Sequence, residues 1–143
     1  MEVSELRKRI LHALDAARKD ASSRRTVVDE AAKAYETFLS SLAVPLLRQA
    51  AQVLTAAGES FSVNSPADSA RLISEKSPQT FVEFVLDTSG ASGQVVGRVS
   101  ITRGRQGVIV EERPIAPKAI ADLTEEDVSQ FLVAEIPKLV VRT

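Results

Sequence analysis

The sequence predicts an α+β fold with three parts: a long, kinked N-terminal helix, a 4-5-stranded antiparallel meander sheet, and a C-terminal helix packed on one face of that sheet. Residues 3–57 space their apolar side chains with the period of an α-helix. Residues 59–113 form short β-branched and aromatic runs separated by Gly, Pro and Ser. Helical spacing returns after Thr124.

The N-terminal helix is predicted by apolar residues that recur about every 3.6 positions. Ala, Leu, Arg, Lys and Glu, all strong helix formers, dominate this segment. Gly58 suits the left-handed position that follows many helices. The apolar positions are Leu6, Ile10, Leu14, Ala17, Ala21, Val28, Ala31, Tyr35, Leu39, Leu42, Leu46, Ala50, Val53 and Ala57.

Two places interrupt the helical pattern. Pro45 has no backbone N–H, but the apolar spacing continues on both sides of it, so we expect a kink there rather than an end. Ser22–Ser23 is followed by Thr26, which together with Asp29 or Glu30 is typical of a capping arrangement. Two arrangements therefore stay open: one continuous kinked helix, which we favour, and a break near residues 22–26.

The sheet is predicted from runs of strand-forming residues joined by short turns. Such connections favour antiparallel neighbours. Thr124 and the acidic residues after it predict the N-cap and first turn of the C-terminal helix, which Pro137 should kink or end. The expected strands are Phe61–Val63, Ser69–Lys76, Thr80–Thr88, Gln94–Thr102 and Gly107–Arg113.

The stretch from Arg103 to Gly107 is either a basic loop that grips a phosphate or the bend of a hairpin. It lies between two strand-forming runs, and hairpin turns need glycine where φ is positive. We therefore expect a hairpin turn with Arg103 and Arg105 in solvent.

Length and composition describe one ordinary globular domain. A chain of 143 residues suits a single core, so we expect one α+β domain over residues 1–143. A helical segment, residues 1–57, can protrude from it, and residues 59–143 hold the sheet and the C-terminal helix. The net charge of −1 gives the whole molecule no long-range attraction to nucleic acid or anionic lipid.

No targeting or membrane segment is expected. The N-terminus is charged and lacks the apolar run of a signal peptide. No stretch approaches the roughly 20 apolar residues that span a bilayer. The chain has no cysteine, which excludes disulfides and thiolate metal sites. We therefore expect a cytoplasmic protein with no membrane partner.

We expect no catalytic, cofactor-binding or metal site, and no enzyme. His12 is the only histidine, so a zinc site of the usual kind cannot be assembled. A serine triad would also need His12, and nothing like Gly-x-Ser-x-Gly surrounds any serine. The chain has no phosphate loop and no dinucleotide fingerprint. The acidic residues of the strands are expected to pair with Arg98 or Arg113 across the sheet; they are Glu83, Asp87, Glu111 and Glu112.

The predicted helix is longer than the body that should cover it. A helix over residues 3–57 is about 80 Å long, whereas a compact domain of this size is about 35–40 Å across. We expect the body to cover residues 38–57, and the earlier stripe to meet a second chain or to fold back at Ser22–Ser23. We favour a homodimer with a helical stalk. The expected interface is Leu6, Ile10, Leu14, Ala17, Ala21, Val28 and Tyr35.

One face of the predicted sheet is more apolar than contact with solvent requires. We expect this outward face to bind a protein partner, or to be covered by residues 138–143. The inward residues are expected to be Val82, Phe84, Leu86, Val95, Val99, Ile101, Val108 and Val110. The outward residues expected at the partner site are Phe81, Val85, Val96, Arg98 and Ile109, with Glu83 and Glu111 beside them.

The sequence thus favours a non-enzymatic protein–protein interaction module that homodimerises through its N-terminal helix. The alternative is a nucleic-acid-associated dimer. Arg7, Arg18 and Arg25 fall within about 20° of one another on a helix and could follow a phosphate backbone. Interleaved acids reduce the net charge of residues 1–33 to +2, from eight basic and six acidic residues, which weakens this alternative.

Overall fold

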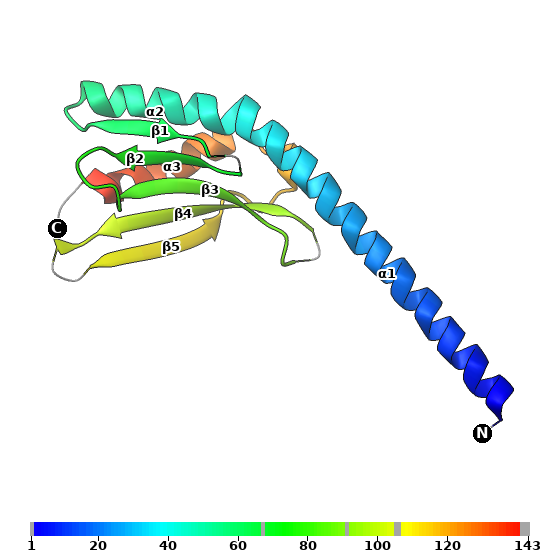
Figure 1. Ribbon diagram of the computed structural model, residues 1–143. Helices are drawn as coiled ribbons and strands as arrows, with labels where there is room; N and C mark the ends of the chain where they lie inside the picture. The colour runs from blue at the N-terminus through cyan, green and yellow to red at the C-terminus, as the bar shows by residue number, and fades with distance from the viewer. Residues whose placement is uncertain (1, 67, 91, 105–106, 141–143) are drawn as a thin grey trace.

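The computed structural model describes residues 2–66, 68–90, 92–104 and 107–140. A helical rod comes first, and a sheet and a further helix follow (Figure 1). The expected α+β fold is confirmed. Its elements are α1 (Val3–Phe38), η1 (Leu39–Ala43), α2 (Val44–Ala56), β1 (Phe61–Asn64), β2 (Ala70–Ser74), β3 (Phe81–Asp87), β4 (Gln94–Thr102), β5 (Val108–Pro114), η3 (Ile120–Asp122) and α3 (Glu125–Val140).

The rod formed by α1, η1 and α2 is helical without interruption. Residues 22–26 lie within α1, and Thr26 Oγ1 donates to the Ser22 carbonyl at 3.1 Å. Thr26 therefore bonds the carbonyl one turn earlier in the same helix, as helical threonines often do, and does not cap a new one. The alternative of a break near residues 22–26, with the helix folding back at Ser22–Ser23, is wrong.

The irregularity expected at Pro45 takes the form of a π-helical segment, η1, just before it. In a regular α-helix the proline ring would clash with the carbonyl four residues earlier. The wider turn of η1 accommodates the ring. The hydroxyls of Ser40 and Ser41 both donate to the Thr37 carbonyl, at 3.2 and 2.6 Å. Figure 1 shows the rod changing direction between α1 and α2.

The strands form a five-stranded sheet in the order β1-β2-β3-β4-β5. Every neighbouring pair is antiparallel, as expected for a meander. α2 packs against β1 and β2, α3 packs against β3 and β4, and the two helices also contact each other. They therefore cover the same face of the sheet, which we call the inner face; the opposite one is the outer face.

Phe84 lies at the centre of the inner-face core. Its ring meets Phe38 of α1 and Phe131 of α3 edge-on, with ring centroids 5.8 Å apart in both pairs. Edge-to-face contacts of this kind are favourable for aromatic rings. They tie α1, the sheet and α3 into one core. Among the described residues, the core side chains at 0% exposure are Ala43, Leu47, Ala70, Leu72, Val82, Phe84 and Val128.

The connection between β4 and β5 is a hairpin turn, as expected. The Arg103 N–H donates to the Gly107 carbonyl at 2.9 Å. Gly104 and Gly107 have φ values of +47° and +84°, in the region that favours glycine. Arg103 is exposed, whereas Arg105 lies outside the described residues. The two glycines therefore serve the bend of the chain.

α3 begins with a reciprocal capping arrangement, as its sequence indicates. The Thr124 hydroxyl accepts from the Asp127 N–H at 3.3 Å, and the Asp127 carboxylate accepts from the Thr124 N–H at 2.9 Å. Lys118 Nζ donates to the same carboxylate at 2.9 Å. The hydrogen bond from Lys118, followed by that from the Thr124 backbone, lowers the pKa of Asp127. Pro137 does not end the helix, which continues to Val140.

Gly97 of β4 lies beneath the ring of Phe131, and a Cβ there would lie only 2.6 Å from the ring atom Cε2. We expect Gly97→Ala to lower the free energy of unfolding by about 1–3 kcal/mol, because the ring and the strand cannot both keep their positions. Urea denaturation measures this loss. Gly90→Ala is the matched control, since its Cβ would meet nothing closer than the Ser92 carbonyl at 3.7 Å. Equal losses in both variants would contradict the steric explanation.

Candidate functional site: a projecting helix and an open sheet face

An apolar stripe on α1 extends away from the sheet. Every residue from 2 to 30 is exposed except Ala21, which is half-buried. Figure 1 shows this blue part of α1 continuing beyond the sheet. The large side chains of the stripe keep 44–50% of their surface exposed. We define the projecting stripe as Leu6, Ile10, Leu14, Ala17, Ala21 and Val28.

The projecting stripe lies on the side of α1 that enters the core further along the helix. Ala31, Tyr35 and Phe38 are the buried residues of α1. At about 100° per residue, the centre of the projecting stripe lies within about 60° of the centre of these three residues. The projecting stripe is therefore the core-facing side of α1, continued past the edge of the body.

Tyr35 does not belong to the uncovered part of α1, and its assignment to an uncovered interface is wrong. Its side chain is 5% exposed, and its hydroxyl lies 2.9 Å from the Phe84 carbonyl and 2.8 Å from the Asp68 carbonyl. Burial, above all, raises the pKa of Tyr35, which keeps the hydroxyl protonated as a donor. Phe84 of β3 and Asp68, between β1 and β2, supply the cover over Tyr35. One turn earlier the loop after β3 packs on α1, where a Cβ on Gly93 would lie 2.5 Å from Ala31 Cβ.

The outer face of the sheet carries four of the five residues expected there. Phe81, Val85, Val96 and Arg98 alternate along β3 and β4 with core residues such as Val82. Directly opposite residues of antiparallel strands lie on the same face. The register of β3 and β4 therefore brings these side chains together on one surface.

Ile109 does not lie on that surface. It pairs with Ile101, a core residue, and is therefore on the inner face. The expected assignment of the β5 residues to the two faces of the sheet is wrong. The hairpin places Thr102 opposite Val108, and this register turns Val108 and Val110 to the outer face. They are 42% and 52% exposed. The length of the turn thus determines which face of the sheet each β5 residue occupies. Alternation along β5 alone led to the wrong assignment.

A row of charged side chains crosses the outer face from β2 to β5. We call it the charged row: Arg71, Glu83, Arg98 and Glu112. Glu83 Oε2 accepts from Arg71 Nε at 2.9 Å and from Arg71 Nη2 at 2.6 Å. Arg98 Nη1 donates to Glu83 Oε1 at 3.2 Å, and Arg98 Nε donates to Glu112 Oε1 at 2.7 Å. The pairing of Glu83 and Glu112 with Arg98 matches the sequence expectation, but the part of Arg71 was missed.

Within the charged row Arg71 and Arg98 cover Glu83, and apolar side chains border the row on both sides. The Glu83 side chain is only 5% exposed, although it lies on the face without helices. The Arg71 guanidinium also stacks on the ring of Phe81, 4.1 Å from its centroid. The apolar neighbours are Ile73, Phe81 and Val110 on one side of the row, and Val85, Val96 and Pro114 on the other.

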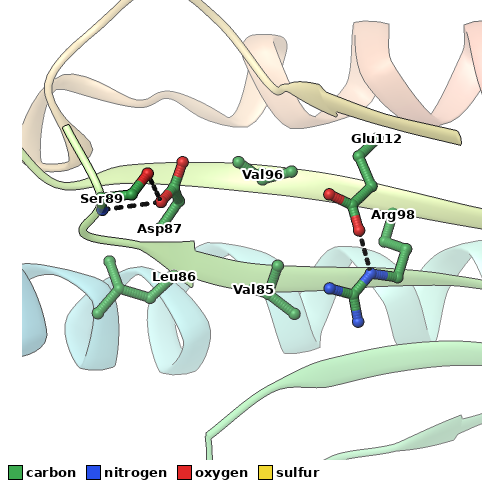
Figure 2. A pocket seen from close by; sticks show the side chains of 7 residues that line it. All are labelled: Val85, Leu86, Asp87, Ser89, Val96, Arg98 and Glu112. Atoms are coloured by element: carbon green, nitrogen blue, oxygen red, sulfur yellow. Dashed lines mark hydrogen bonds and ion pairs between the residues drawn. The ribbon is translucent and has the colours of Figure 1, made fainter.

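A shallow pocket of about 350 Å³ lies at one end of this face (Figure 2). Asp87 accepts hydrogen bonds from the Ser89 hydroxyl at 2.6 Å and from the Ser89 N–H at 2.9 Å. These bonds, the hydroxyl's first, lower the pKa of Asp87. Arg98 in this pocket is already bonded to two carboxylates, so it is not a free cation for an anionic ligand. The lining residues are Val85, Leu86, Asp87, Ser89, Val96, Arg98 and Glu112.

The C-terminal residues expected over the outer face lie elsewhere. Residues 138–140 belong to α3, so that expectation is wrong for them; residues 141–143 lie outside the described part of the chain. Lys138 Nζ lies 3.0 Å from Glu135 Oε2 and 3.5 Å from Glu111 Oε2. Glu111, expected on the outer face, pairs with the core residue Val99 and is therefore on the inner side. Arg113 Nε also donates to Glu135, at 2.8 Å.

The remaining candidate residues lie on the projecting part of α1, away from the sheet. His12 is exposed, as are Arg7, Arg18 and Arg25. Among the described residues, no three His, Cys, Asp or Glu side chains come together as a metal site requires. None of the helices in the described ranges combines the length and the apolar character needed to cross a bilayer.

The chain was compared with protein-family models, curated proteins and solved structures. No protein-family model, no curated protein and no solved structure matches the chain.

The charged row makes a prediction about stability. We expect Glu83→Gln to lower the free energy of unfolding by about 1–3 kcal/mol, because the buried amide cannot accept the bonds of both arginines. Glu112→Gln, at a side chain that is 49% exposed, should cost no more than about 1 kcal/mol. Urea denaturation of both variants in parallel compares the losses. A Glu112→Gln loss as large as that of Glu83→Gln would contradict the order of burial.

Proposed function

We propose that this chain is a non-enzymatic protein-interaction module with two contact surfaces. The projecting stripe of α1 pairs with α1 of a second copy, and the outer face of the sheet binds another protein. The observation that carries the proposal is the continuity of the projecting stripe with the core-facing side of α1. A surface built like a core, but left outside the body, is typical of an interface.

The apolar area of the stripe supports a reversible homodimer. Leu6, Ile10, Leu14 and Val28 each keep about half of their surface in water. Full burial of such side chains contributes about 1.5–3 kcal/mol each, so covering the exposed halves in two copies contributes about 6–12 kcal/mol. Association costs about 4–15 kcal/mol in lost freedom. The free energy gained by burial and the cost of association are similar in size, which favours a dimer that dissociates on dilution.

The stability of α1 itself supports the same pairing. About 28 residues of α1, some 42 Å of helix, project from the body. Isolated helices in water gain little from intrinsic propensity, and most helical stability in proteins comes from packing an apolar side. Exposed ion pairs such as Arg9–Glu5 and Lys19–Asp15 add about 0.3–0.5 kcal/mol each. A second helix on the projecting stripe supplies the missing contacts.

The outer face suits a protein partner because of its mixed chemistry. Protein interfaces combine apolar patches with polar groups that are already satisfied. Phe81 and Val110 present apolar surface, and the arginines and carboxylates of the charged row neutralise one another. The charged row therefore adds no net charge that would attract a polyanion.

A nucleic-acid-associated dimer is the second candidate. Arg7, Arg18 and Arg25 are exposed along one edge of α1, which suits contacts with a phosphate backbone. The acidic residues between them reduce the attraction, so this candidate ranks below the protein-interaction module.

The homodimer predicts the effect of a charge in the projecting stripe. We expect Ile10→Glu to weaken self-association by about 10- to 100-fold, because each dimer loses two buried apolar side chains and gains two buried charges. Sedimentation equilibrium of the full chain measures the dissociation constant. His12→Glu is the matched control, since it introduces the same side chain on the opposite side of α1. Equal effects of the two substitutions would contradict the assignment of the interface.

The nucleic-acid candidate has a separate test. A gel-shift titration with duplex DNA and single-stranded RNA should give no complex at about 50 mM salt if α1 binds only protein. A phosphate binder should instead bind at that salt and lose affinity steeply by about 200 mM. Loss of such binding in Arg7→Gln/Arg18→Gln/Arg25→Gln would replace the protein-interaction proposal by the second candidate for α1.

A further inference from the structure

We propose that the two copies pair their α1 helices antiparallel, so that the N-terminal end of each helix lies next to the body of the other copy. This inference rests on the proposed homodimer and adds its orientation and register. It also identifies the part of the body that receives the partner's helix end.

The position of the body excludes a parallel pair. The projecting stripe and the buried residues Ala31, Tyr35 and Phe38 lie on the same side of α1. In a parallel pair these residues of both copies would face each other at one level. Each already carries its own body on that side, so the two bodies would occupy the same space. In an antiparallel pair the partner's helix ends where the body begins.

The sizes of the side chains favour the same orientation. Leu6, Ile10 and Leu14 occupy the first half of the projecting stripe, and Ala17 and Ala21 follow before the stripe ends at Val28. Helix axes approach to about 8–10 Å, depending on the side chains between them. A parallel pair would oppose large to large and Ala to Ala, so its axes would diverge. An antiparallel pair opposes Leu14 and Ile10 to Ala17 and Ala21 in the central part of the contact.

One register meets these conditions. With the two-fold axis between residues 15 and 16, Leu14 lies opposite Ala17 of the second copy, Ile10 opposite Ala21, and Val3 opposite Val28. In this register residue 25 lies level with Leu6, and the stem of the adjacent Arg24, which lies on the side of the stripe, covers Leu6. All of these large apolar side chains are exposed in the single chain.

The receiving surface is the end of the body beside Val28. There η3 packs against α1, and Gly93 meets both Ala31 and Ile120. Val28 is the last exposed member of the projecting stripe before Ala31 is buried. In the proposed register Val3 of the second copy covers Val28, so the partner's helix continues the cover that η3 and the loop after β3 begin.

Charges at the two edges of the stripe distinguish the orientations. On one edge the antiparallel register brings Arg9 near Asp20 of the second copy, an attractive pair. On the other edge it brings Arg7 near Arg25, a repulsive pair. A parallel pair would instead place Arg25 beside Asp20 of the second copy. The side chain at position 25 therefore has opposite effects in the two arrangements.

Distances between spin labels test the orientation directly, and the cysteine-free chain allows single labelled sites. We expect labels on Ser4→Cys to lie about 35–45 Å apart in the antiparallel dimer, and about 20–25 Å apart in a parallel one. Labels on Asp15→Cys, near the two-fold axis, serve as the control and should lie about 20–25 Å apart in both. A short Ser4 distance overturns the orientation but leaves the homodimer. The absence of any coupling at both sites overturns the homodimer itself.

A charge reversal gives an independent readout of the register. Arg25→Glu should tighten the antiparallel dimer about 2- to 5-fold, because it turns the repulsion with Arg7 into an attraction. Lys8→Glu, the same charge change on the opposite side of α1, is the control. Sedimentation equilibrium compares the dissociation constants. Weakening by Arg25→Glu, or no tightening beyond the control, contradicts this register.

Discussion

A helix longer than the body it packs on is the constraint from which the other features of this molecule follow. The core-facing side of α1 is one continuous apolar surface, and the body covers it only from Ala31 onward. Within the body, Tyr35 and Phe38 join the aromatic core around Phe84. Outside it, the same side of the helix meets water. The hydrophobic effect that holds the fold together therefore also favours the arrival of a second helix.

The two faces of the sheet carry different kinds of contact. The inner face carries the aromatic contacts that join both helices to the strands. The outer face carries the charged row, in which Glu83 is buried beneath Arg71 and Arg98. Such a network fixes side-chain positions more than it adds stability, because the cost of removing charges from water offsets much of the attraction. The result is a surface with defined side-chain positions, on which the proposed recognition of another protein rests.

Features that depend on local chemistry could be predicted from the sequence. The period of α1, the glycines of the β4–β5 turn and the cap at Thr124 each follow from a few neighbouring residues. Features that depend on how distant segments meet could not. Tyr35 is buried because Phe84 of β3 and Asp68, between β1 and β2, reach it, and no pattern within α1 reports those contacts. The face of Ile109 depends on the register that the turn imposes, which alternation within β5 does not contain.

Of the two candidate surfaces, the projecting stripe could be predicted from local sequence and the charged row could not. The exposed positions of the projecting stripe follow from helical period and helix length, both of which the sequence contains. The charged row needed the pairing of β2 with β3, because only that register brings Arg71 beside Glu83. An arginine within a strand-forming run was the only signal of this contact, and a solvent-facing residue gives the same signal.

The solution mass of the full chain, measured by light scattering over a range of concentrations, tests the central claim most directly. If the projecting stripe is covered by a second copy, the mass approaches twice the 15.4 kDa of one chain, while a chain that begins at Val27 keeps its single-chain mass. A full chain that stays at 15.4 kDa up to millimolar concentration, with residues 3–30 helical, would contradict the account.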